Sequence, residues 1–302
     1  MERRQVTLKE KLKAHYDNRN FQPQETSANK VGVAFYWFMT ISLLFESLLI
    51  LIPTLFKDNT TVKLLCQVLV FMALVECNAC WFLTYKDVSN YVRKTFIEKY
   101  FTQIQETPPG WRSCPSCQLD APPRSHHCKL CEKCILKRDH HCFFTGSCIG
   151  FYNQRYFIIF CVHMIWSNAF ALYLQLTYLN EAMPIFSNYF VNYLPGINVL
   201  LYFFGNIPIG IVLIVIHSHF CIFCLGAGIF FFVWQMMIVS SGQTSHEAWK
   251  NINPYGKSVL DNFRSVFGPL KFSWLMLFFP VPFDLSEDGI KWEIQPKSVK
   301  GH

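Results

Sequence analysis

Apolar and polar residues alternate in long blocks along this 302-residue chain. Two apolar runs, 31–56 and 62–85, follow one another in the first third, and a third run covers 156–178. Each is long enough to cross the roughly 30 Å of hydrocarbon in a bilayer as a helix. The blocks therefore predict membrane-spanning helices separated by polar segments.

A fourth apolar run, 199–239, is too long for one span and tight for two. We expect the fourth span at 217–239, with residues 199–216 in the lumenal interface or forming a broken lead-in around Pro208. The alternative uses the weak apolar stretch 183–193 as well and gives four crossings after the central polar segment.

The apolar run 272–283 is short and contains Pro280 and Pro282, so it predicts a segment embedded in the membrane surface. The predicted fold is an all-α polytopic membrane protein with four transmembrane helices and a cytosolic cysteine-rich domain between spans two and three. In chain order we expect a cytosolic tail (1–30), spans one and two (31–85), the cysteine-rich domain (86–155), spans three and four with a lumenal loop (156–241) and a cytosolic C-terminal region (242–302).

Composition supports a membrane protein. Hydrophobic residues make up 52% of the chain and charged residues only 16%, which argues against an ordinary soluble protein. The net charge of +7 gathers in the tails and the central polar segment, whereas loop 179–198 has no Lys or Arg. This asymmetry predicts that the basic segments face the cytosol and the loop faces the lumen. No basic groove interleaved with aromatic residues accompanies the charge, so nucleic-acid binding is not expected.

Seven of the thirteen cysteines lie within residues 114–148, at Cys-x-x-Cys spacings beside histidines. On the reducing side of a membrane this pattern favours metal binding over disulfides. Eight ligands can close two tetrahedral zinc sites, and because such sites have no open position, both zinc ions would be structural. The spacing alone leaves open which ligand belongs to which site. The candidates are Cys114, Cys117, His127, Cys128, Cys131, Cys134, His141 and Cys148.

His140 and Cys142 remain once those eight ligands are assigned. An adjacent imidazole can take the proton of a thiol and leave the nucleophilic thiolate. Asp139 is placed to hold the tautomer of His140, as the acid does in a Ser-His-Asp triad. The residues thus predict a catalytic thiol, Cys142, with His140 as its base and Asp139 as the orienting acid. The alternative is that Cys142 is a spare ligand and His140 a surface imidazole.

The sequence Asp-His-His-Cys at 139–142, with Pro-Pro-Arg-Ser-His-His-Cys at 122–128, resembles the Asp-His-His-Cys (DHHC) family of protein S-acyltransferases, or palmitoyltransferases. Thr-Ser-His-Glu at 244–247 is similar to that family's Thr-Thr-x-Glu motif. Residues 262–268 resemble its C-terminal motif, whose Asn supports the fold near the active site. The resemblance covers about residues 31–285 and includes the layout of four spans.

The resemblance implies a ping-pong reaction. Cys142 would take a long-chain acyl group from palmitoyl-CoA or a similar acyl-CoA and pass it to a membrane-proximal cysteine of a substrate protein. The acyl chain would lie in a cavity between the spans, and the protein would reside in Golgi or ER membranes. Arg124 and His126 would contact the CoA phosphates, and Phe144 would offer an aromatic wall. By the family's interleaved pattern, one zinc would bind Cys114, Cys117, His127 and Cys134, and the other Cys128, Cys131, His141 and Cys148.

The chain departs from the family pattern around the nucleophile. Phe143 and Phe144 replace Pro and Trp, Ser147 replaces an Asn, and Ala121 replaces a basic residue that often precedes Pro-Pro. These changes bear on the loop geometry, the acyl-chain preference and one CoA contact. They leave the triad and the zinc ligands intact.

Two other functions account for parts of the sequence. A catalytically weak or inactive zinc module acting as a scaffold would share the zinc ligands but would have no use for Cys142 and His140. A transporter built on the intramembrane acids Glu46 and Glu76 is disfavoured by four spans without an internal repeat. Such acids are costly in a bilayer, so each is expected to serve a function or to pair with a neighbouring span.

Overall fold

The computed structural model describes residues 26–93, 110–183, 186 and 190–294. Expectations for the N-terminal tail up to residue 25 and for the last residues of the chain lie outside these ranges. Part of the alternative crossing at 183–193 also lies outside them.

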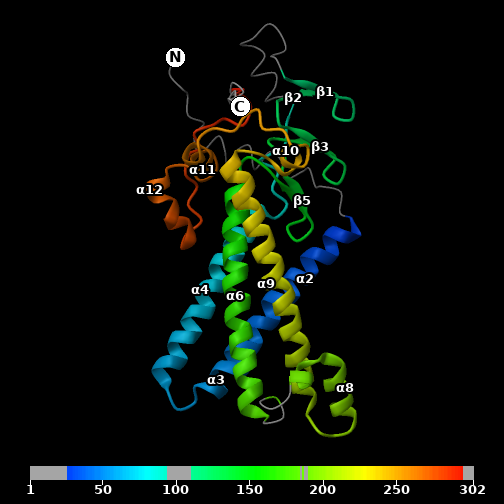
Figure 1. Ribbon diagram of the computed structural model, residues 1–302, viewed down its shortest axis with the longest axis vertical. Helices are drawn as coiled ribbons and strands as arrows, with labels where there is room; N and C mark the ends of the chain where they lie inside the picture. Colours follow the sequence, from blue (N-terminus) through cyan, green and yellow to red (C-terminus); the bar gives the residue numbers. More distant parts are fainter. Residues whose placement is uncertain (1–25, 94–109, 184–185, 187–189, 295–302) are drawn as a thin grey trace, which may run out of the picture. The chain divides into compact units, whose positions relative to one another are not determined.

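Four helical segments in the described part of the chain are long and apolar enough to cross a membrane, as the sequence predicts (Figure 1). The protein is therefore an integral membrane protein, mostly helical, with its cysteine-rich region between the second and third spans. The first span comprises α2 (Ser27–Glu46), the π-helical turn η1 (Ser47–Leu51) and α3 (Ile52–Leu55), and the others are α4 (Thr60–Thr84), α6 (Gln154–Ala182) and α9 (Ile209–Ser241).

The fourth span begins at Ile209 and not at residue 217, which corrects the expected boundary. A separate helix, α8 (Pro195–Phe203), precedes it, and the chain turns between Phe204 and Pro208. Proline has no N–H to continue a helix but is tolerated where one begins, so Pro208 separates α8 from α9. The lead-in is thus broken at the expected proline, and all apolar residues after it join the span.

The remaining helical elements are short. The 3₁₀ turn η2 (Phe190–Tyr193) precedes α8. After α9 come α10 (Ser245–Trp249), α11 (Val259–Phe267), α12 (Leu270–Ser273) and the 3₁₀ turn η3 (Trp274–Leu277). Among the described residues after 270, which include the apolar run 272–283, no helix is long enough to cross a bilayer.

The cysteine-rich region folds into three β-hairpins, which the sequence analysis did not anticipate. Each pairs two three-residue antiparallel strands, and a two-stranded hairpin is marginally stable by itself in water. The region therefore depends on other contacts, such as metal ligation, to hold its shape. The pairs are β1 (Arg112–Cys114) with β2 (Leu119–Ala121), β3 (His126–Cys128) with β4 (Lys133–Ile135), and β5 (His140–Cys142) with β6 (Ser147–Ile149).

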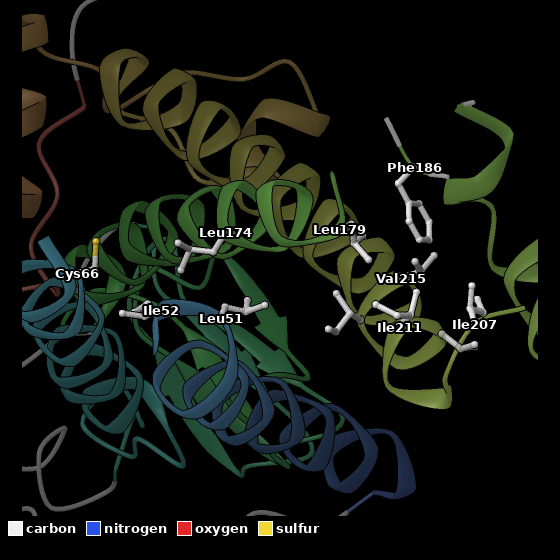
Figure 2. Packing of buried hydrophobic residues seen from close by; sticks show 11 residues of the cluster. Leu51, Ile52, Cys66, Leu174, Leu179, Phe186, Ile207, Ile211 and Val215 are labelled. Atoms are coloured by element: carbon white, nitrogen blue, oxygen red, sulfur yellow. The ribbon is translucent and has the colours of Figure 1, made fainter. Parts of the chain in front are cut away.

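The chain forms two compact units. The second unit is built from the membrane-spanning helices around a buried apolar cluster that includes Leu51, Leu174 and Val215 (Figure 2). The first unit contains the hairpins and the C-terminal region. Its described parts are 26–36, 80–93, 110–157 and 235–294, and those of the second unit are 37–79, 158–183, 186 and 190–234.

A polar cluster is buried within the second unit. Glu46 accepts a hydrogen bond from His217, and Gln175 Nε2 lies 3.2 Å from both Glu46 carboxylate oxygens. Ser42 Oγ lies 3.1 Å from the other nitrogen of His217. Glu46 thus pairs with two neighbouring spans, which satisfies a carboxylate that lipid would otherwise leave unpaired. Glu76, the other intramembrane acid, is buried, and its Oε2 has no hydrogen-bond partner among the described residues.

Candidate active site and metal centres

The three hairpins gather the eight candidate ligands into two groups of four. Within each group the sulfur and nitrogen donor atoms lie within 4.8 Å of one another. Three thiolates and one imidazole are a donor set that zinc accepts in tetrahedral geometry, so the residues fit structural zinc. The groups are Cys114, Cys117, His127 and Cys134, and Cys128, Cys131, His141 and Cys148, which is the interleaved grouping implied by the family resemblance.

Strand alternation separates metal ligation from chemistry in β5. Successive side chains of a strand point to opposite faces, so His140 and Cys142 share one face and His141 points to the other. His141 lies opposite Cys148 of β6, a member of the same ligand group. The single hairpin thus holds two zinc ligands, His141 and Cys148, and β5 presents the candidate base and nucleophile together on its opposite face.

His141 is oriented by a residue far from the hairpin. Its Nε2 donates to Asn29 Oδ1 at 3.0 Å, while Nδ1 lies 3.4–3.7 Å from the sulfurs of its ligand group. A hydrogen bond to one ring nitrogen sets the tautomer and leaves the other nitrogen's lone pair for a metal. Asn29, at the start of α2, therefore orients this ligand.

Asp139, His140 and Cys142 form a triad in which the acid and the thiol are buried and His140 is partly exposed. His140 Nδ1 donates to Asp139 Oδ2 at 2.8 Å, and Asp139 and Cys142 are only 5% and 7% exposed. Burial acts to raise the pKa of Asp139, but the hydrogen bond and the charge of His140 outweigh it and hold that pKa well below its usual range.

The pKa values of His140 and Cys142 shift in opposite directions. Burial acts to lower the pKa of His140, yet its contacts with Asp139 and Cys142 raise the pKa to about 9. Burial acts to raise the pKa of Cys142, and its contacts with His140 and Thr145 lower it overall. Together the shifts favour a Cys142 thiolate beside a His140 imidazolium, the reactive form of a cysteine nucleophile.

Donors from three residues hold the Asp139 carboxylate. Besides His140, the backbone N–H of Ser245 donates to Oδ1 at 2.6 Å, and the side chain of Gln235 donates to Oδ2 at 2.6 Å. Ser245 belongs to the Thr-Ser-His-Glu motif, whose Thr244 and Glu247 cap α10 reciprocally. This capping box explains why the motif has Thr and Glu three residues apart.

Arg124 has a different environment from the one expected for a phosphate contact. Its guanidinium donates to both carboxylate oxygens of Glu247, at 2.9 and 2.6 Å, and to the Gly242 carbonyl at 2.8 Å. The rings of Trp292 and Tyr255 lie 4.5 and 5.0 Å from its central carbon, and the side chain is 3% exposed. Arg124 Nε and Nη2 are thus directed at protein acceptors, and its expected contact with CoA stays a prediction.

His126 lies in a basic surrounding that includes a residue the sequence analysis did not single out. Its ring centroid is 4.2 Å from that of His246 in α10. Burial, followed by the charge of His246 and the nearby cations Arg112, Arg138 and Lys250, lowers the pKa of His126 to about 4. Two imidazoles with lowered pKa values therefore lie near three cations, and one of them, His246, directly follows Ser245, which contacts the triad.

Phe143 and Phe144 contact the start of the first span and the end of the second. The indole of Trp81 donates to the Phe144 carbonyl at 2.9 Å, and the Phe144 ring lies 6.3 Å from that of Phe35. Gly32 approaches the loop so closely that a Cβ there would meet the Phe143 carbonyl oxygen at 2.6 Å. The loop after the nucleophile is therefore fixed by helix contacts, with no Pro-Trp pair in it.

The structure thus brings together the triad and both ligand groups, and it withdraws Arg124 from solvent. Sequence reasoning missed Gln235, Gln154 and Lys137, which connect to Asp139 by hydrogen bonds. The signal was present, because a glutamine inside an apolar span needs a buried partner.

Comparison with known proteins gives one family and no curated relative. The family described as DHHC palmitoyltransferase matches residues 108–252, which run from the first hairpin to the end of α10. No curated protein matches.

Proposed function

From the premise that residues 108–252 form a domain of the DHHC palmitoyltransferase family, we propose that this protein is a protein S-acyltransferase that uses Cys142 as its nucleophile. The family implies the activity, and the geometry of the triad supports the choice of residue. The observation that carries the proposal is the hydrogen bond from partly exposed His140 to buried Asp139, with Cys142 on the same face of β5 as His140.

In the first half-reaction the Cys142 thiolate attacks the carbonyl carbon of an acyl-CoA thioester. A bond forms between Cys142 sulfur and that carbon, the bond from the carbon to the CoA sulfur breaks, and His140 gives its proton to the departing CoA thiolate. Asp139 holds His140 in the orientation for this transfer. Acyl-Cys142 and free CoA are the products.

In the second half-reaction a cysteine thiol of a substrate protein gives its proton to His140 and attacks the acyl-Cys142 carbonyl. The new carbon–sulfur bond forms on the substrate, and the bond to Cys142 breaks. This restores the Cys142 thiolate and the His140 imidazolium, so the reaction is a ping-pong exchange with no net change in the enzyme.

The basic group around His126 is the proposed site for the CoA phosphates. Arg112, Arg138 and Lys250 supply positive charge there, and the neutral rings of His126 and His246 supply hydrogen-bond donors. Arg124, whose Nε and Nη2 are paired with Glu247, stays a proposed CoA contact through its remaining nitrogen. Phe144 keeps its proposed role as an aromatic wall beside the acyl group.

Zinc, when bound, supplies cross-links between the hairpins and no chemistry. The eight ligands would hold two ions, and each ligand group joins residues from two hairpins or their turns. His141 and Cys148 would hold the ion at the third hairpin, and this cross-link would fix β5, which carries His140 and Cys142.

The proposed orientation places the hairpins and the C-terminal region in the cytosol, beside Golgi or ER membranes. The positive charge of these segments favours the cytosolic side. The exposed aromatic residues Phe272, Trp274 and Phe279 suit the membrane surface, where aromatic rings gather. Protein substrates would then present cysteines close to the bilayer.

Labelling with an alkyne analogue of palmitoyl-CoA tests the proposed function. Purified protein should acquire a hydroxylamine-sensitive label that is absent from the Cys142→Ala variant. Cys66→Ala is the matched control, because Cys66 is also buried but belongs to neither ligand group. A well-folded, zinc-loaded wild-type protein that takes no label from any acyl-CoA would favour the scaffold alternative.

A further inference from the structure

Three buried polar side chains of the first unit have no part in the mechanism described so far. Lys137 lies between β4 and β5, Gln154 begins α6, and Gln235 lies in the last turns of α9. They are 5%, 2% and 0% exposed. Burying such groups is costly unless each is hydrogen-bonded, so their partners are informative.

The three side chains form one line of hydrogen bonds that ends at the triad. Lys137 Nζ donates to Gln154 Oε1 at 3.1 Å, and Gln154 Nε2 donates to Gln235 Oε1 at 2.9 Å. Gln235 Nε2 donates to Asp139 Oδ2 at 2.6 Å, on the same oxygen that accepts from His140. The line therefore reaches the base through a single carboxylate oxygen.

The chemistry of the two ends fixes the direction of both amides. The carboxylate of Asp139 only accepts, and Lys137 Nζ donates at the other end of the line, although burial lowers the pKa of Lys137 to about 7. Gln154 must therefore turn its oxygen toward Lys137, and Gln235 must turn its nitrogen toward Asp139. A reversal of either amide would oppose two donors or two acceptors in a buried place. The line has one arrangement, and in that arrangement every bond points toward Asp139.

We propose that Gln154 and Gln235 are positioning residues for the acyl-transfer reaction, with Lys137 setting the direction of their amides. The inference rests on the proposed function. The third donor on Asp139 keeps the carboxylate from rotating, so that Oδ2 stays in the plane where His140 Nδ1 can donate. His140 then holds its other nitrogen toward Cys142.

A purely structural role is the competing explanation, because the line also ties α6 and α9 to the loop before β5. The two roles differ in their response to Gln154→Glu. This variant keeps the acceptor for Lys137 and adds a favourable charge pair, so it preserves the tie. It cannot donate to Gln235, so the direction of the line is lost.

The test compares full-length Gln154→Glu and Gln235→Leu with wild type and with Gln67→Leu. Gln67 is a span glutamine of α4 without a hydrogen-bond partner among the described residues, so it is a matched control. The first readout is the rate at which iodoacetamide alkylates Cys142, followed by peptide mass spectrometry. The second splits palmitoyl-CoA autoacylation into kcat and KM. Zinc content and melting temperature report folding.

Both line variants should lower the alkylation rate and kcat by about tenfold, the effect of one hydrogen bond to a charged group. The KM for palmitoyl-CoA and the zinc content should stay within about twofold of wild type, and Gln67→Leu should resemble wild type throughout. If Gln235→Leu loses zinc, Gln154→Glu decides the outcome. A folded Gln154→Glu protein with wild-type alkylation and kcat would overturn the proposal.

Alkylation needs no acyl-CoA, so it separates this inference from the proposed function. A wild-type protein that alkylates rapidly at Cys142 yet takes no acyl group would refute the function and leave the positioning role intact. If both Gln154→Glu and Gln235→Leu autoacylate as fast as wild type, the proposed function is supported and the positioning role is refuted.

Discussion

Arg124 and Glu247 form a buried, bidentate ion pair: Arg124 Nε lies 2.9 Å from Glu247 Oε1, and Nη2 lies 2.6 Å from Oε2. The pair connects the turn before β3 with the motif after the last span. Glu247 also accepts from the Thr244 backbone N–H at 2.8 Å, so one carboxylate serves both the helix cap and the ion pair. Ser245 of the same motif donates its backbone N–H to Asp139. The ion pair therefore supports the triad indirectly, through this motif.

Arg124→Ala should leave Glu247 charged, buried and partly unpaired. Breaking a buried pair in this way costs about 3–5 kcal/mol, and the lost order should also reduce autoacylation. Arg124→Lys keeps the charge but cannot make the two parallel bonds, so it should fall between Ala and wild type. Thermal denaturation in detergent ranks wild type, Arg124→Lys and Arg124→Ala by melting temperature. Equal stability of Arg124→Ala and wild type would show that the pair contributes nothing.

Asp139→Asn should shift the reactivity of Cys142 to higher pH. The Asp139 carboxylate helps to raise the pKa of His140 to about 9, and the imidazolium in turn lowers the pKa of Cys142. Removing the acid's charge lowers the pKa of His140, so less imidazolium faces the thiol and the pKa of Cys142 rises. Iodoacetamide alkylation of Cys142 between pH 5 and 10 reads the midpoint directly.

At neutral pH the Asp139→Asn enzyme should lose about one hundredfold or more in kcat, the scale of general acid–base catalysis. Raising the pH should recover part of the alkylation rate, because the thiolate forms without the imidazolium. An unchanged pH midpoint in the folded variant would show that Asp139 does not act through His140.

Gly32→Ala tests whether the loop after the nucleophile is fixed by α2. The new Cβ would meet the Phe143 carbonyl oxygen at 2.6 Å, which is too close for any side chain. The loop must shift, at a cost of roughly 1–3 kcal/mol, and autoacylation should fall. Gly226→Ala is the control, because a Cβ at that position of α9 meets nothing within 4 Å. Equal activity of the two variants would count against a fixed loop.

Glu46 and His217 should show strong coupling in the second unit. His217→Leu leaves the Glu46 carboxylate in the bilayer with Gln175 alone, whereas Glu46→Leu with His217→Leu removes both polar groups. The double variant should therefore be more stable than the His217→Leu single variant, since apolar replacement of a buried pair is often tolerated. Thermal melting of the four proteins in the cycle gives the coupling. If the stability loss of the double variant equals the sum of the losses of the two single variants, the two residues do not interact.

Much of this architecture is readable from the sequence, because its signals are local. Apolar length gave the spans at 31–56 and 62–85 to within a few residues of the helices observed at Ser27–Leu55 and Thr60–Thr84. The fourth span was misplaced, because hydropathy alone cannot tell which side of Pro208 begins the helix. The strand at residues 140–142 was missed, because three-residue strands carry almost no periodic pattern.

The site was readable where it depends on residue types at fixed spacing and unreadable where it depends on partners distant in the chain. The ligands and the triad lie within one short segment, so their spacing indicates them as candidates, although it leaves open which ligand belongs to which zinc site. Gln235 and Asp139 are separated by 96 positions, and no local pattern connects them. The ion pair of Arg124 was missed for the same reason: its partner Glu247 is 123 positions away, and no local pattern connects the two residues.

The central claim is that Cys142 carries the acyl group between donor and acceptor. Single-turnover mixing with palmitoyl-CoA, followed by peptide mass spectrometry before and after addition of a cysteine-containing acceptor protein, tests it most directly. We predict that the peptide containing Cys142 gains a palmitoyl group and loses it as the acceptor is acylated. An acceptor that becomes acylated while Cys142 stays unmodified, or in the Cys142→Ala variant, would contradict the account.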